Sequence, residues 1–298
     1  MIRAYLVDAS PYIFRAFHSL PSSIVDPAGR QIHAIHGFCG FLLRLLSEER
    51  PTHLVVAFDG SLTTSFRNTI YPEYKAHREP PPRELEDQVE DCRELASALG
   101  AHVLIDSELE ADDLIGSVAG GLAATGAGAV IVSSDKDLAQ LVTDTVELYD
   151  FAKDRRYGPA EVRRAFGVPP RQIADLLALA GDPVDNIPGV PGVGRKTAVR
   201  LLESFPHLEA LYERLPEVEE LPLRGAKAVR RRLEQGESRA RLSKRLAVIV
   251  TDGPVEPDPD ALRYRGPGWA RLEDLAERLG MTSLVGRARQ LESDALSG

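Results

Sequence analysis

Three apolar runs that each lead to an aspartate constrain the fold of this chain most strongly. They are Ala4–Asp8, Leu54–Asp59 and Ala129–Asp135. Each run is short and rich in β-branched residues, which is typical of parallel strands buried on both faces. The carboxyl ends of parallel strands lie at one edge of a sheet, where ligands of open α/β sheets bind. The sequence therefore predicts that these aspartates converge at one sheet edge.

Strand and helix signals alternate from residue 1 to about residue 150. Besides the three runs, the pattern predicts helices over His36–Glu49, Leu85–Leu99 and Glu110–Leu122, and a short strand over His102–Ile105. This alternation predicts an α/β fold with a mostly parallel, Rossmann-like sheet and helices on both faces. From about Gly158 the strand signals almost vanish, and helices separated by glycine and proline follow.

The composition is that of an ordinary globular protein, with 43% hydrophobic and 27% charged residues. No apolar run is long enough to cross a membrane, and no signal peptide precedes the first strand, so we expect a cytoplasmic protein. Cys39 and Cys92 are isolated, which argues against a disulfide framework and a thiolate zinc site. The net charge of -9 does not indicate a nucleic-acid binder, but the charges are unevenly distributed.

Further carboxylates gather in Glu110–Asp113, Asp135–Asp137 and Asp182–Asn186. Each segment alone has a plain alternative explanation. An acidic first turn complements a helix dipole, and Asp182–Asn186 is compatible with an ordinary turn. Residues three apart share a helix face, so Glu110 and Asp113 are expected to point together.

Taken together, these acids indicate a metal site. Carboxylates that converge repel one another unless cations offset their charge, and hard oxygen ligands favour Mg²⁺ or Mn²⁺. One magnesium ion keeps several waters, so this number of acids suits two ions about 4 Å apart that clamp an in-line phosphoryl displacement. The nine candidates are Asp8, Asp59, Glu110, Asp112, Asp113, Asp135, Asp137, Asp182 and Asp185.

The segment Ser65–Arg78 mixes aromatic side chains with cations shortly after Asp59. Aromatic faces can stack unpaired bases, and lysine and arginine can hold phosphates. A solvated basic loop is the alternative.

The segment Gly189–Ala198 reads as a glycine hairpin that opens a helix. Glycines let backbone N–H groups approach a phosphate. The segment lacks the Gly-Lys-Ser/Thr order of a Walker loop and the preceding strand of a dinucleotide-binding fold. We therefore interpret it as a helix–hairpin–helix that grips duplex backbone. The helical run after it is either a solvated face or an extension of this track; its cations are Lys227, Arg230, Arg231, Arg232, Arg239, Arg241 and Lys244.

In order and spacing, these motifs resemble the 5′ nuclease (flap endonuclease) family, in particular the 5′–3′ exonuclease domain of bacterial DNA polymerase I. The resemblance covers nearly the whole chain. It rests on Leu6–Asp8, Arg15–Phe17, Phe66–Arg78, Glu110–Asp113, Ser134–Asp137, Gly181–Asn186, Gly189–Ala198 and Leu279–Leu284.

The resemblance implies a division of the chain into three parts. Residues 1–157 would form a PIN-like catalytic domain with a helical arch at about 61–90. Residues 158–253 would form the helix–hairpin–helix (H3TH) DNA-binding subdomain. Residues 254–298 would form a connector and helices that pack back on the core.

The resemblance also implies a two-metal phosphodiesterase, a Mg²⁺-dependent 5′–3′ exonuclease and flap endonuclease of DNA replication and repair. Its substrates would be DNA with 5′ ends, 5′ flaps or junctions. Asp8, Asp59, Glu110, Asp112 and Asp113 would surround one ion, and Asp135, Asp137, Asp182 and Asp185 the other. Asp112 would be the shared ligand.

Further site residues follow from the same resemblance. Lys75 and Arg78 would act on the scissile phosphate, and Tyr74 would stack a base. A monovalent cation, K⁺, would bind at the hairpin. The expected DNA contacts are Arg15, Phe66, Arg67, Gly189, Gly192, Gly194, Arg195, Lys196 and Thr197.

Two features depart from the family pattern. Ala9 stands where many relatives have glycine, and the chain stops where a polymerase domain would begin. We therefore expect a monomeric, stand-alone nuclease with no fused polymerase and no membrane partner. Two other functions stay open, a non-catalytic module that binds DNA junctions and a PIN-like ribonuclease. The intact acidic set disfavours the first, and the duplex-gripping hairpin disfavours the second.

Overall fold

The computed structural model describes residues 3–61, 65–255 and 258–297. Six strands form one sheet in the order β3-β2-β1-β4-β5-β6. Neighbouring strands are parallel except β6, which is antiparallel to β5. The strands are β1 (Arg3–Asp8), β2 (Leu54–Asp59), β3 (His102–Asp106), β4 (Gly128–Val132), β5 (Val146–Asp150) and β6 (Arg155–Tyr157).

Twelve α-helices are found in these described residues. They are α1 (Ser10–Ser19), α2 (His33–Glu49), α3 (Phe66–Ile70), α4 (Arg83–Ala98), α5 (Ala111–Ala124), α6 (Pro159–Phe166), α7 (Ile173–Ala180), α8 (Arg195–Ser204), α9 (Leu208–Glu213), α10 (Ala226–Ala247), α11 (Trp269–Arg278) and α12 (Ser283–Ser297). Short 3-10 helices include η1 (Asp137–Leu141) and η2 (Phe151–Lys153). None of these helices is long and apolar enough to span a membrane.

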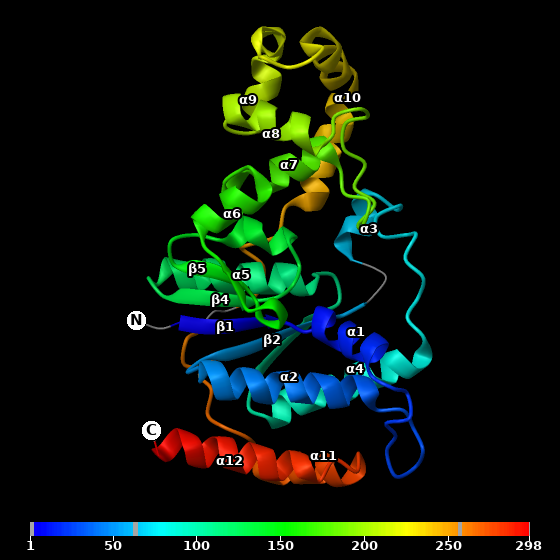
Figure 1. The fold of residues 1–298 in the computed structure, drawn as a ribbon, viewed down its shortest axis with the longest axis vertical. Coiled ribbons are helices and arrows are strands. Elements are labelled where there is room, and N and C mark those ends of the chain that lie inside the picture. The colour runs from blue at the N-terminus through cyan, green and yellow to red at the C-terminus, as the bar shows by residue number, and fades with distance from the viewer. Residues whose placement is uncertain (1–2, 62–64, 256–257, 298) are drawn as a thin grey trace.

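The sheet lies between two helical layers (Figure 1). Helices α1, α2 and α4 cover one face, and α11 and α12 pack on the outer side of α4 and α2. Helix α5 covers the other face, where it contacts β1, β2, β3 and β4. The helical subdomain continues from this second side. The predicted α/β fold with a following helical subdomain is thus confirmed.

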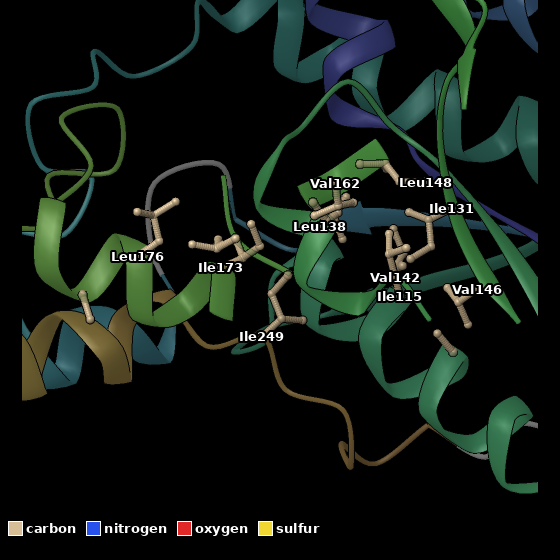
Figure 2. Packing of buried hydrophobic residues seen from close by; sticks show 14 of the residues in the cluster. Ile115, Ile131, Leu138, Val142, Val146, Leu148, Val162, Ile173, Leu176 and Ile249 are labelled. Carbon is tan, nitrogen blue, oxygen red and sulfur yellow. The ribbon is translucent and has the colours of Figure 1, made fainter. Parts of the chain in front are cut away.

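One hydrophobic core joins the sheet to the helical subdomain. Figure 2 shows Ile115 of α5 and Ile131 of β4 in the same cluster as Leu138, Ile173 and Ile249. Since Leu138 belongs to η1 and Ile173 begins α7, the cluster crosses the boundary between the two parts. This shared core fixes the helical subdomain relative to the carboxyl ends of the strands.

Residues 246–253, which we call the strap, comprise the last two residues of α10 and the segment after it, and they lie along α5. A Cβ atom at Gly116 would lie 2.5 Å from the carbonyl oxygen of Val250, and one at Gly120 would lie 2.6 Å from that of Thr251. Both glycines are therefore required for this close approach. The amide of Gly253 donates a hydrogen bond to Ser117 Oγ at 3.0 Å.

Some elements differ from the sequence-based expectation. The third apolar run ends as a strand at Val132, so Asp135 lies in the following turn rather than on the strand. Helix α1 and strands β5 and β6 were not predicted. In the arch expected at 61–90, helix is confined to α3 and the first half of α4, and turns lie between them. Residues 62–64 of that arch, and residues 256–257 and 298 of the expected connector, lie outside the described residues.

Candidate metal centre

Strands β1 and β2 bring Asp8 and Asp59 to the same sheet edge, as predicted. Asp8 is only 4% exposed, and Ser133 Oγ donates a hydrogen bond to its Oδ2 at 2.8 Å. The Asp59 carboxylate accepts hydrogen bonds from Ser10 Oγ at 2.6 Å and from the amide of Ala111 at 2.9 Å. The serines orient both carboxylates. Sequence reasoning missed them, although Ser133 directly follows β4 and Ser10 opens α1.

Helix α5 presents its acidic first turn to this edge, but only in part. Glu110 and Asp112 line a cavity together with Asp8 and Asp59. Asp113, in contrast, is fully buried and binds Arg67 through both carboxylate oxygens, at 2.7 and 2.8 Å. Asp113 is not among the residues that line the cavity, and its expected role as a metal ligand stays a prediction.

Two adjoining cavities lie at this edge. The first, of about 280 Å³, is lined by Asp8, Asp59, Glu110, Asp112 and Asp135. The second, of about 530 Å³, is lined by Asp135 and a second set of acids, Asp137, Asp182 and Asp185. One carboxylate oxygen from each member of this second set lies within 4.8 Å of the others. Asp135 lines both cavities, whereas Asp112 lines only the first, so Asp135 is the carboxylate common to the two cavities.

Mutual repulsion and burial perturb these acids. Burial, followed by the charges of Asp59 and Asp135, raises the pKa of Asp8 to about 8. Burial and Asp135 raise the pKa of Asp112 well above its usual value. Burial and the charge of Asp135 also raise the pKa of Asp137 to about 8. A group of acids that cannot all ionise at neutral pH is suited to bind cations.

Metal binding should therefore release protons near pH 7. Carboxylates bind metal in the deprotonated form, and Asp8 and Asp137, whose pKa values are raised to about 8, are mostly protonated at pH 7 without a bound cation. Calorimetric titration with Mn²⁺ in two buffers of different ionisation enthalpy measures this release. The number of protons released should fall as the pH rises beyond the raised pKa values of Asp8 and Asp137. Identical heats in both buffers at pH 7 would show that the acids are already ionised.

The segment after α3 places two cations, Lys75 and Arg78, in the lining of the first cavity, where they also reach Asp185 of the second. Lys75 has a positive φ of 55°, and its Nζ lies 3.0 Å from Glu110 Oε1 and 3.7 Å from Asp185 Oδ2. Arg78 forms an ion pair with Asp185 and donates to the carbonyl of Val184. Burial lowers the pKa of Lys75, but Glu110 and Asp185 raise it by more, so the ammonium stays charged.

Two residues of this segment have roles other than those expected. Arg67 is 2% exposed and Tyr74 is 3% exposed, so neither offers a surface to DNA in this structure. The Tyr74 hydroxyl lies 3.2 Å from both Glu110 and Asp185, where it bridges the two groups of acids instead of stacking a base. Two other expected DNA contacts lie outside the hairpin. Arg15 on α1 is exposed, and Phe66 is half-buried beneath the Arg67 guanidinium.

The predicted hairpin lies between α7 and α8, as expected. Gly192, Gly194, Arg195 and Lys196 are exposed, and Thr197 is half-buried. Gly194 is the N-cap of α8, so the amides of the first helical turn point toward solvent from this end.

Gly189 differs from the other hairpin residues. Its amide donates a hydrogen bond to Ser243 Oγ at 2.9 Å and is therefore not free for a phosphate. A Cβ at this position would lie 2.3 Å from the amide nitrogen of Gly181, so the glycine is needed for packing. Arg232 of α10 donates to the carbonyl of Gly192 at 3.2 Å and adds a cation beside the hairpin. Other cations of the α10 run pair with acids, among them Arg230, Arg241 and Lys244.

This arrangement defines a class of protein, an α/β domain with acidic cavities at its sheet edge, joined to a helix–hairpin–helix subdomain. Residues 3–167 match the family model "5′-3′ exonuclease, N-terminal resolvase-like domain", and residues 168–269 match "5′-3′ exonuclease, C-terminal SAM fold". The chain therefore belongs to the 5′–3′ exonuclease family.

Curated relatives agree with this assignment. The chain is 33% identical over 273 residues to the 5′-3′ exonuclease of Buchnera aphidicola subsp. Schizaphis graminum, which covers 91% of this chain and 94% of that protein. It is 41% identical over 293 residues to DNA polymerase I of Rhizobium leguminosarum, which covers 96% of this chain. The chain spans only 28% of the length of that polymerase.

Solved structures share the fold at low sequence identity. The T5 5′-exonuclease with bound divalent metal ions (zinc) superposes with a TM-score of 0.66 at 20% identity, and the match covers 98% of each chain. The catalytic core of Rad2 in complex with a DNA substrate gives a TM-score of 0.63 at 17% identity, covering 97% of this chain and 91% of that chain.

Proposed function

We propose that this chain hydrolyses DNA phosphodiesters at 5′ ends and 5′ flaps, as a structure-specific 5′–3′ exonuclease and flap endonuclease. The single observation that carries this proposal is the pair of acidic cavities that share Asp135, with Lys75 and Arg78 lining the first cavity and pairing with Asp185 of the second. The family relatives, among them a 5′-3′ exonuclease of similar length and several DNA polymerase I proteins, favour the same activity.

The donors that line the two cavities fit two divalent ions. Among the described lining residues, the metal-ligating side chains are all carboxylates, with no histidine or cysteine. Oxygen-only donor sets favour Mg²⁺ or Mn²⁺ over softer metals. Asp8, Glu110 and Asp112 would hold one ion, Asp137, Asp182 and Asp185 the other, and Asp135 would contact both. When bound, such a pair activates a water as nucleophile and stabilises the leaving oxygen.

The residues around the acids position the substrate for this reaction. Lys75 and Arg78 place positive charge between the two cavities, where the non-bridging oxygens of a scissile phosphate would gain charge. In the absence of DNA both cations pair with acids, so a phosphate has to replace Asp185 as their partner. Asp59, held by Ser10 and Ala111, would orient water or metal at the rim of the first cavity.

The hairpin would hold duplex DNA without reading its sequence, because phosphates carry no base identity. Replacing Arg195 and Lys196 together with alanine should therefore weaken binding about equally on duplexes of unrelated sequence. Each lost phosphate contact should lower the salt slope of log K by roughly 0.9. The cut position relative to the junction should persist, since the acids that set it lie at the sheet edge.

Binding isotherms at several salt concentrations, on two duplexes of unrelated sequence, measure these effects. Arg171→Ala, at an exposed arginine in the turn before α7, is a control that removes one surface charge of the same subdomain. An unchanged salt slope in the Arg195 and Lys196 variant, or a loss confined to one sequence, would remove the hairpin from the DNA interface.

Several finer features remain part of this proposal. The relatives named DNA polymerase I favour a role in replication and repair, in the cytoplasm. The resemblance also favours Mg²⁺ as the working ion, K⁺ at the hairpin and a monomeric protein.

Cleavage rates on matched substrates test the function. A labelled DNA 5′ flap, the same flap with an RNA 5′ strand and an intact duplex should be compared in Mg²⁺ and in EDTA. We expect Mg²⁺-dependent cleavage of the DNA flap. Binding of the DNA flap without any cleavage would favour the junction-binding module, and preferential cleavage of the RNA strand would favour the ribonuclease.

A further inference from the structure

Arg67 lies at the point where three parts of the chain meet. It belongs to α3, and its guanidinium binds both carboxylate oxygens of Asp113 on α5, at 2.7 and 2.8 Å. Its Nε donates to the carbonyl of Leu246 at 2.8 Å, and its Nη2 donates to that of Val248 at 3.0 Å. The Arg67 side chain thus joins three parts of the chain, namely the first turn of α5, the segment that carries Lys75, and the strap.

Glu110 is the metal-centre residue that depends on this junction. Its carboxylate lies 3.4 Å from Arg67 Nη1, and its backbone amide donates to Asp113 Oδ2 at 3.1 Å. Its other partners, Tyr74 and Lys75, belong to the same segment as Arg67. Arg67 therefore sets the position of Glu110 in two ways. It holds Asp113, which fixes the Glu110 backbone, and together with Tyr74 and Lys75 it contacts the Glu110 carboxylate.

The same junction is connected to the hairpin. Ser243 on α10 accepts the hydrogen bond of the Gly189 amide, and Leu246 lies one turn further along the chain. Asp113 Oδ1 also accepts a hydrogen bond from the amide of Val250, at 2.9 Å, so the strap is held to α5 from two directions. The side that would hold duplex and the side that would hold metal are thus linked by these hydrogen bonds and by the last turn of α10.

We infer that Arg67 is a positioning residue that sets Glu110 for divalent-metal binding, and not a DNA contact. The inference rests on the proposed function only in that it assigns metal to the first cavity. Arginine is required because its planar fork reaches four strong acceptors at once, whereas lysine concentrates its donors at one point.

The variant Arg67→Lys separates the two roles. It keeps the positive charge opposite Asp113, so the buried carboxylate is not left without a cation. A positioning role predicts Mn²⁺ affinity roughly 10- to 100-fold weaker, the range typical of residues that orient metal ligands. It also predicts an unchanged affinity for duplex DNA and an unchanged salt slope. A phosphate contact predicts a different result for the metal, namely parental Mn²⁺ affinity, with at most a small loss of DNA affinity because lysine keeps the positive charge.

Mn²⁺ binding should be measured without DNA, from the paramagnetic resonance signal of the free ion, well below the melting temperature. Arg156→Lys is the matched control, since Arg156 on β6 binds both oxygens of Glu49 at 2.7 Å, far along the sheet from the acids. Arg156→Lys should remove the guanidinium hydrogen bonds to Glu49 and keep parental Mn²⁺ affinity. Asp113→Asn is a second variant that weakens the same junction from α5 and should shift Mn²⁺ affinity in the same direction as Arg67→Lys.

Parental Mn²⁺ affinity in Arg67→Lys and Asp113→Asn, even with lowered melting temperatures, would overturn the inference and leave Arg67 a stabilising residue only. A similar loss of affinity in Arg156→Lys would also overturn it, because the effect would then be general. Failure of the parent to cleave DNA would contradict the proposed function but would not alter this comparison.

Discussion

Replacing Asp135 and Asp137 together with asparagine is expected to lower the cleavage rate of a DNA 5′ flap about a thousandfold or more. Asp135 lines both acidic cavities, and Asp137 lines the second. A bound divalent ion supplies several kcal/mol of transition-state stabilisation, which corresponds to roughly this loss of rate. Single-turnover rates in Mg²⁺ measure the effect directly.

The same double variant should still bind the flap and should remain folded. Asparagine has nearly the shape of aspartate. The substitutions also remove a buried carboxylate and its repulsion by Asp135, which together raise the pKa of Asp137 to about 8. The matched control replaces Asp144 and Asp252, two exposed turn residues, with asparagine and should cut at the parental rate. Parental cleavage by the Asp135 and Asp137 variant would mean that these acids hold no catalytic metal.

Lys75→Ala is expected to reduce kcat by about a hundredfold to a thousandfold, with a much smaller change in KM. A cation beside the scissile phosphate stabilises charge that develops in the transition state, and the loss of one such group costs roughly 3–4 kcal/mol. The ammonium of Lys75 already lies within 3.0 Å of Glu110, which places it at the rim of the metal centre.

Steady-state kinetics on the flap separate the two parameters. Lys153→Ala removes a lysine that pairs with Asp150 on another part of the surface, and it should leave both parameters unchanged. A rise in KM with normal kcat in Lys75→Ala would reassign Lys75 to uniform phosphate binding.

The buried strands could be predicted from the sequence because their apolar pattern is continuous. The run Leu54–Asp59 coincides with β2, and the run Ala4–Asp8 coincides with all of β1 except its first residue. Elements that depend on tertiary pairing could not be predicted in this way. Strand β6 is three residues long and mostly charged, and it exists because it completes the edge of β5. Helix α1 did carry a signal, Pro11 in its first turn.

An aspartate at a strand end indicates a metal site only when other acids converge with it. Strands β3 and β5 also end on aspartate, at Asp106 and Asp150. Asp106 accepts hydrogen bonds from two amides of its own turn, which lower its pKa, and Asp150 pairs with Lys153. Asp8, in contrast, faces other acids, and its pKa is raised. The sequence supplied the candidates, and the fold distinguishes those that converge from those that serve local turns.

The pairing of Arg67 with Asp113 could not be predicted from the sequence for a different reason. The two residues are 46 positions apart and lie in motifs that separately indicate phosphate binding and metal binding. Only the packing of α3 against α5 and the strap shows that they neutralise each other in the interior. A buried charge without a partner is strongly unfavourable, so each residue accounts for the presence of the other.

Product mapping on a 5′-flap duplex tests the central claim most directly. The flap strand carries one label at its 5′ end or one at its 3′ end, and the reaction is run with Mg²⁺ and with EDTA. We expect Mg²⁺-dependent cuts at the flap junction and at the 5′ end, in the flap strand only and on any sequence. Absence of cleavage in Mg²⁺, or equal cleavage in EDTA, would contradict it.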